Sequence, residues 1–200
     1  MKPDFFRTDF SRIMRSSAFF LVMISIFLTS CGKTVVVTDT SFETENYTIE
    51  EIWEIKDEYD FVYEMDMYLA TKSEYGDDIS ELNKNQKTVF IIGELEAEVN
   101  NGGFWQYFYN SSGDYANEIV NALEKIGAKN TAQICKKAIS VFGNKVPTDR
   151  VERMDFIEDE SNSGIFEVLS QCDTDFFNST EDLAALRYDF IIKNKNDFQK

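Results

Sequence analysis

The stretch EVNNGGFWQYFYNSSGDY, residues 98–115, decides the fold of this chain. Asn100 and Asn101 are followed by two glycines, and both residue types reach left-handed backbone conformations at little cost. Five aromatic residues then occupy six positions, before a Ser-Ser-Gly turn. The pattern predicts that a long helix ends near Gly102 and Gly103 and that a short aromatic helix follows.

The aromatic residues fall on two faces of this short helix. Phe104, Tyr107 and Phe108 share one face, while Trp105 and Tyr109 share the other. One aromatic face would suffice for a core, so the second suggests another contact. Two interpretations stay open: a core hub whose amides satisfy backbone groups at two helix ends, and a platform for a small ligand or glycan.

The pattern is helical along most of the remaining chain. A capping box at Thr48 and Glu51 begins a run in which apolar residues recur every three or four positions, to about residue 69. Further helices are expected over 82–99, 114–126, 130–142, 147–157, 165–169 and 179–194. The sequence therefore predicts an all-α fold, with a single compact multi-helix domain over residues 47–200.

Residues 1–30 are predicted to be a signal peptide rather than part of the fold. Lys2 and three arginines precede an apolar run over 18–28, which is too short for a membrane span of about 20 residues. Leu-Thr-Ser-Cys follows at 28–31, and this order resembles a bacterial lipoprotein signal. The resemblance implies that Cys31 carries lipid, including palmitate, and becomes the mature N-terminus. The alternatives are a secretory peptide with a chance cysteine and a transmembrane anchor.

The residues after Cys31 are expected to connect lipid and domain. Residues 31–46 are threonine-rich and lack proline, which is typical of a flexible tether. Several acyl chains give stable attachment where a single chain is marginal. The predicted location is the bacterial cell envelope, outside the cytoplasm and held to the membrane by the lipid anchor.

The charge of the chain is strongly negative and unevenly distributed. Its 36 acidic and 20 basic residues give a formal net charge of −16. Residues 43–66 and 149–182 each carry a net −9, whereas 125–148 holds five lysines and no acidic residue. Such a surface disfavours direct binding to nucleic acid and favours a basic protein or peptide as partner.

On the first predicted helix, acidic side chains gather opposite an apolar stripe of Ile52, Ile55, Tyr59 and Val62. The acidic residues are Glu50, Glu54, Asp57, Glu58 and Glu64. Two interpretations stay open, a solvated face and a surface for a cationic partner. The lysine segment of a second copy is a rival partner for the same charges, so a homodimer is an alternative.

Enzymatic and metal functions receive little support from the residue types. The chain has no histidine, which removes the usual general base and the commonest metal ligand. Glu96 and Glu98 are neighbouring carboxylates, but no nucleophile accompanies them. Cys135 and Cys172 are spaced for neither zinc nor redox motifs, and whether they form a disulfide stays open. We expect no enzyme activity, no cofactor and no metal.

The segments EAEVNNGGFWQYFYNSSGDYANEIVNALEKIGA (96–128) and CKKAISVFG (135–143) resemble the DNA-mimic protein-like family. The similarity covers residues 48–195. It implies an all-α acidic domain, often dimeric, that presents carboxylates where DNA presents phosphates and so occupies a DNA-binding regulator. The family motif, with a structural or binding role and no catalytic one, is carried by Asn101, Gly102, Gly103, Phe104, Gln106, Asn110 and Gly113.

The predicted export signal departs from that family pattern, because a DNA-binding regulator of the cytoplasm is then not the expected partner. The sequence instead predicts a membrane-anchored acidic helical interaction module. It is expected to bind a basic protein or peptide outside the cytoplasm. Small-ligand or glycan binding at the aromatic stretch is the alternative.

Overall fold

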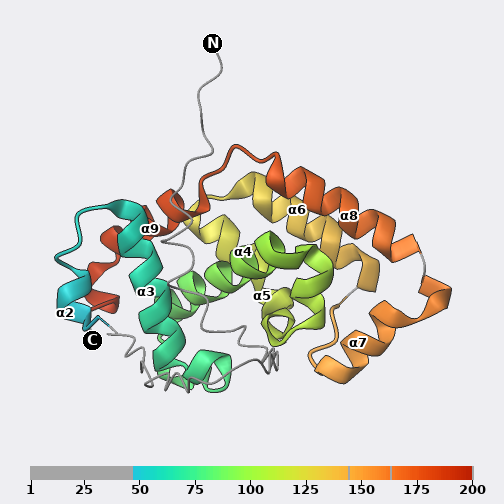
Figure 1. The fold of residues 1–200 in the computed structure, drawn as a ribbon, viewed down its shortest axis with the longest axis horizontal. Coiled ribbons are helices and arrows are strands. Elements are labelled where there is room, and N and C mark those ends of the chain that lie inside the picture. The colour runs from blue at the N-terminus through green and yellow to red at the C-terminus, as the bar shows by residue number, and fades with distance from the viewer. Residues whose placement is uncertain (1–46, 144, 163, 200) are drawn as a thin grey trace, which may run out of the picture. The chain divides into compact units, whose positions relative to one another are not determined.

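The computed structural model describes residues 47–143, 145–162 and 164–199. These residues form one compact helical domain, and no strand occurs among them (Figure 1). The all-α prediction is therefore confirmed. The predicted signal peptide over 1–30, Cys31 and the tether over 31–46 lie outside the described residues.

Eight α-helices and six short 3₁₀ turns make up the described part of the chain. The helices are α2 (Ile49–Ile52), α3 (Glu58–Lys72), α4 (Lys84–Tyr109), α5 (Ala116–Ile126), α6 (Lys129–Ile139), α7 (Arg150–Glu158), α8 (Gly164–Phe177) and α9 (Leu183–Lys193). The turns are η1 (Glu74–Gly76), η2 (Ile79–Glu81), η3 (Ser111–Tyr115), η4 (Ser140–Phe142), η5 (Glu160–Asn162) and η6 (Lys195–Asp197).

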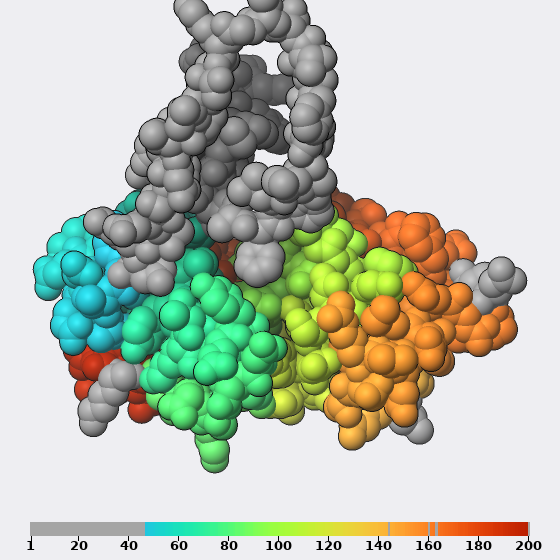
Figure 2. All heavy atoms as spheres, turned by 60° about the horizontal axis from the view of Figure 1, so that its bottom comes forward, coloured from blue at the N-terminus to red at the C-terminus, as the bar shows by residue number. Residues whose placement is uncertain are grey.

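Helix α4 lies at the centre of the domain and contacts most of the other helices. Val89, Ile92, Leu95 and Val99, spaced by three and four residues, are fully buried along it. In Figure 1, α3 and α9 pack together on one side of α4, while α6 and α8 pack together on the other. On the face drawn in Figure 2, green residues of the segment after α3 and orange residues of α7 lie on either side of yellow-green residues from the middle of the chain.

Two glycines end helices where the sequence predicts it. Gly127 follows α5 with a φ of 94°, a left-handed C-cap that glycine adopts without penalty. Gly143 follows η4 with a φ of 78°. The short connection at Gly127 turns the chain back, so that α5 and α6 pack against each other.

The first predicted helix, expected from 48 to about 69, is wrong as a single element. The Thr48 capping box is present, but α2 ends at Ile52 and α3 begins only at Glu58. The Asp57 carboxylate accepts hydrogen bonds from the amides of the second and third residues of α3 and so starts a new helix. Because the break shifts the helical register, Tyr59 is 59% exposed instead of buried with the apolar stripe.

The last two helices also differ from their predicted bounds. Helix α8 runs to Phe177, well beyond the expected end at 169. Helix α9 begins at Leu183 rather than near 179, because the Asp182 carboxylate accepts a hydrogen bond from the amide of Ala185 and caps it. Within the described residues, none of the helices combines the length and the apolar character that crossing a membrane requires.

Candidate functional site

The two motif glycines interrupt α4 without ending it. Gly102 has φ −155° and ψ 20°, and Gly103 has φ 75° and ψ −176°, a combination that is almost confined to glycine. The Asp173 carboxylate of α8 accepts a hydrogen bond of 2.7 Å from the backbone amide of Phe104. It therefore caps the second half of α4. A Cβ on Gly103 would lie 2.5 Å from Asp173 Oδ2, so the cap needs glycine there.

The aromatic residues after this interruption belong mainly to the core. Phe104, Tyr107 and Phe108 are buried, as expected for the first face. Trp105 and Tyr109, on the second face, are half-buried and stack on each other with ring centroids 4.5 Å apart. This burial favours the core hub over the ligand platform.

Glu98 joins the two halves of α4 and the following turn. Its carboxylate accepts hydrogen bonds from Gln106 Nε2 at 2.7 Å and from Asn110 Nδ2 at 2.9 Å. The Ser112 hydroxyl lies between Glu98 and Glu94 and donates to Glu94 at 2.7 Å. Burial raises the pKa of Glu94, the bond from Ser112 opposes this, and the nearby Glu98 adds to it. The motif amides thus serve the internal structure.

Arg153 of α7 binds the other side of the turn that follows α4. It is fully buried, and its guanidinium donates to the backbone oxygens of Phe108, Asn110 and Pro147, at 2.5, 2.9 and 2.9 Å. It also pairs with Asp114 at 2.6 Å. The sequence analysis did not predict this role, because Arg153 stands in an acidic block and its partners lie on other elements of the chain.

The remaining motif residues divide into two kinds. A Cβ on Gly113 would lie 2.7 Å from Arg153 Nε, so glycine leaves room for the buried guanidinium. A Cβ on Gly102 would meet the side chain of Gln106. Asn101, by contrast, is exposed, and its side chain makes no hydrogen bond within the described part of the chain. Hydrogen bonds within the described residues therefore do not explain the presence of Asn101 in the motif.

Arg187 links three helices through two carboxylates. Its guanidinium, with a buried side chain, pairs with Asp66 of α3 and with Glu96 of α4, each at 2.5 Å. Burial lowers the pKa of Arg187, but the two carboxylates outweigh this and raise it. Glu96 and Glu98 thus bind different partners, and the two do not form a joint acid–base pair.

The residues of the predicted acidic face are divided among α2, α3 and the turn between them. Glu50 lies on α2, Glu54 and Asp57 lie in the turn, and Glu58 and Glu64 lie on α3. The first four are exposed, but Glu64 is half-buried, and burial raises its pKa. The expectation of one continuous acidic helix face is therefore wrong, for the same reason that Tyr59 is exposed: the break at 53–57 changes the register.

Tyrosines accompany these acidic residues on the surface of α3. Tyr59 and Tyr63, one helical turn apart, are 59% and 43% exposed. The Tyr59 hydroxyl donates a hydrogen bond of 2.6 Å to Asp182, which fixes its ring. The exposed part of this surface therefore combines carboxylates with large aromatic side chains.

Two lysines of the lysine-rich segment 125–148 form ion pairs with acidic residues of the same chain. Lys136 pairs with Glu124 at 2.8 Å, and Lys137 pairs with Asp175 at 3.1 Å. These pairs reduce the positive charge that a second copy would meet.

The two cysteines, Cys135 on α6 and Cys172 on α8, are both buried free thiols. Burial raises the pKa of each thiol.

Within the described residues, no group of three His, Cys, Asp or Glu side chains converges that could hold a metal ion. In a comparison with known proteins, a family model described as DMP19-like protein matches residues 80–194. No curated protein and no solved structure matches the chain. The matched segment holds α4 to α9, with the interrupted helix, Asp173, Arg153 and Arg187, and the family is not a known enzyme family. The chain belongs to the DMP19-like protein family.

Proposed function

We propose that this chain is a membrane-anchored interaction module that binds a basic protein or peptide outside the cytoplasm. The acidic surface of α2 and α3 is the binding surface. Glu50, Glu54 and Glu58 are exposed there, and their carboxylates form no ion pair with any described residue. Exposed carboxylates without an ion-pair partner among the described residues are suited to lysine or arginine side chains of a partner, and this observation carries the proposal.

The neighbouring tyrosines support the same surface. Tyr59 and Tyr63 offer large apolar area beside the carboxylates, and tyrosine is enriched where proteins meet. The ring of Tyr59 is already fixed by its hydrogen bond to Asp182, so it loses little conformational freedom on binding. Charge would then steer the encounter, while the aromatic area would contribute affinity.

The family supports an acidic interaction role. The DMP19-like family is a DNA-mimic family, and a DNA mimic presents carboxylates to a surface that otherwise binds phosphates. The partner is therefore expected to carry a basic surface. Anchoring through Cys31 would place that partner outside the cytoplasm, which separates it from regulators that bind chromosomal DNA.

Reversing three charges tests the acidic surface. We expect a variant with Glu50→Lys, Glu54→Lys and Glu58→Lys to bind a synthetic arginine- and lysine-rich peptide at least about tenfold more weakly in calorimetry at low salt. The three side chains are exposed, so the melting temperature should change little. Binding to the unaltered protein should also fade at 1 M salt, where the Debye length is about 3 Å.

The matched control reverses Glu152, Asp155 and Glu158, which are exposed on α7 in the second acidic block. This control changes the net charge by the same amount. Equal weakening by both variants would contradict a specific surface on α2 and α3. A homodimer that dissociates with salt in sedimentation, and is lost in the α2–α3 variant, would assign the surface to self-association.

Lipid attachment at Cys31 is tested separately. Cys31→Ser removes the thiol that would take the acyl chain, so we expect loss of acyl labelling and release of the protein from the membrane fraction. Labelling with a fatty-acid analogue in the bacterial host measures this. Cys135→Ser, at a buried free thiol, is the control and should keep the label. Unchanged labelling of Cys31→Ser would refute the anchor.

A further inference from the structure

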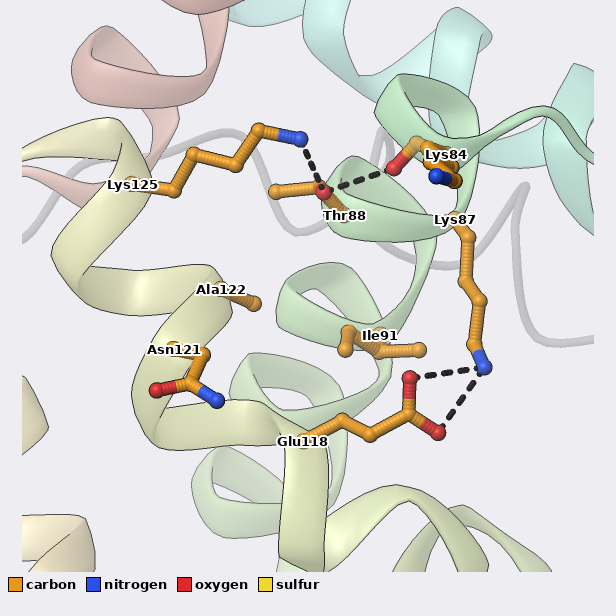
Figure 3. Close-up of a pocket in the computed structure, with 8 residues that line it drawn as sticks. All are labelled: Lys84, Lys87, Thr88, Ile91, Glu118, Asn121, Ala122 and Lys125. Carbon is orange, nitrogen blue, oxygen red and sulfur yellow. Dashed lines mark hydrogen bonds and ion pairs between the residues drawn. The ribbon is translucent and has the colours of Figure 1, made fainter.

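A basic depression lies between the first turns of α4 and helix α5. It has a volume of about 430 Å³. Figure 3 shows Lys84 and Lys87 on one side, from α4, and Lys125 on the other, from α5. Ile91 and Ala122 lie between them and give the depression an apolar floor.

The local charge of this depression is opposite to that of the protein. Three lysines line it with a single acidic residue, Glu118, in a chain whose net charge is −16. Lys87 pairs with Glu118 at 2.7 Å. Among the described residues, Lys125 donates to two neutral oxygens, Asn85 Oδ1 at 2.6 Å and Thr88 Oγ1 at 3.1 Å.

The ammonium group of Lys84 forms no ion pair or hydrogen bond with the described residues. Together with Lys125, it leaves two positive charges that no carboxylate of the described chain neutralises within ion-pair distance. Bringing like charges together is unfavourable unless an anion compensates them. The depression therefore has an excess of about two positive charges for a ligand.

Two of the lysines are held in place before any ligand arrives. The Lys125 ammonium lies 5.2 Å from the ring centre of Phe190, in addition to its two hydrogen bonds. Lys87 is held by Glu118 and lies 5.9 Å from the ring centre of Tyr115. Side chains that are already ordered lose less entropy on binding, which favours a small ligand.

We propose that this depression binds a small dianion with an apolar body, of the phosphate monoester class. A phosphate monoester carries a charge of about −1.5 to −2 at pH 7, which matches the uncompensated charge. Its oxygens would accept hydrogen bonds from the ammonium groups of Lys84 and Lys125. Its apolar body would cover Ile91 and Ala122, and the exposed Asn121 amide would add a polar contact. The site is independent of the acidic surface on α2 and α3.

Titration of the full chain with phenyl phosphate tests this site. We expect saturable binding in calorimetry, with inorganic phosphate binding more weakly because it lacks the apolar body. A double variant, Lys84→Gln with Lys125→Gln, should lose about tenfold or more in affinity, since two charge-assisted hydrogen bonds are removed. Its melting temperature identifies any loss of fold.

The control, Lys136→Gln with Lys137→Gln, removes the same charge from α6, outside the depression. It should bind phenyl phosphate as the unaltered protein does. Absence of saturable binding, or equal loss in the two double variants, would overturn the site. Equal affinity for inorganic phosphate and phenyl phosphate would overturn the role of the apolar floor.

Discussion

Gly103→Ala is expected to lower the free energy of unfolding by about 3–5 kcal/mol. The φ of 75° and ψ of −176° at Gly103 cost a residue with a Cβ about 1–3 kcal/mol in backbone strain alone. The new methyl group would also lie 2.5 Å from Asp173 Oδ2. Asp173 must then move, and the Phe104 amide loses its hydrogen bond in a partly buried region, at a further cost of about 1–3 kcal/mol.

Gly127→Ala provides a matched control for this effect. Gly127 also has a positive φ, of 94°, but apart from its chain neighbours no atom of the described residues lies within 4 Å of a Cβ placed there. The same substitution therefore tests left-handed strain without crowding, and it should cost about 1–2 kcal/mol. Urea denaturation of both variants measures the difference. Equal costs would show that Asp173 does not hold the interrupted helix in place.

The comparison of these two glycines also shows what the sequence can predict. The helix end at Gly127 is a local event, since glycine after an amphipathic run is enough to predict it, and it is confirmed. At Gly103 the sequence predicts an interruption but not its purpose. The group that requires glycine is the carboxylate of Asp173, 69 residues beyond the amide that it caps, and no local pattern connects the two.

The N-terminal helices show the opposite failure, in which a local pattern misleads. Apolar spacing of three and four continues from Ile52 across the turn to Val62, so periodicity alone predicts one helix. Asp57 accepts two amide hydrogen bonds and starts a new helix there, which the spacing does not reveal. As a result Tyr59 is exposed, although the sequence placed it in the core.

Buried charge is the part of the site that sequence analysis could least foresee. Arg153 and Arg187 contribute to the net charge as any surface arginine does, yet both are buried. Each satisfies groups from distant elements: Arg187 joins α3, α4 and α9, and Arg153 joins α7 to the end of α4. Hydrophobic periodicity carries no information about such residues, because their burial depends on partners that only the fold brings together.

Arg153→Met should lower the free energy of unfolding by about 3–5 kcal/mol. Methionine fills much of the space but donates no hydrogen bond, so the backbone oxygens of Phe108 and Pro147 lose the guanidinium donor. The backbone oxygen of Asn110 loses it as well and keeps the amide of Gly113 as a donor. Buried carbonyl groups without partners each cost about 1–3 kcal/mol when the surrounding chain cannot rearrange. Arg153→Lys keeps the charge but lacks the planar fork of donors, so it should recover only part of the loss.

Arg150→Met is the control for that prediction, because it makes the same substitution one turn earlier on α7. Arg150 is exposed and donates to Tyr109 O at 3.1 Å, where water can replace it, so its loss should cost about 0.5–1 kcal/mol. Denaturation midpoints measure both variants. Similar midpoints would mean that Arg153 does not stabilise the turn after α4 and that its bonds to Glu98 are sufficient. A much lower midpoint for Arg153→Met would show that the motif turn, including Gly113, is built around a buried guanidinium.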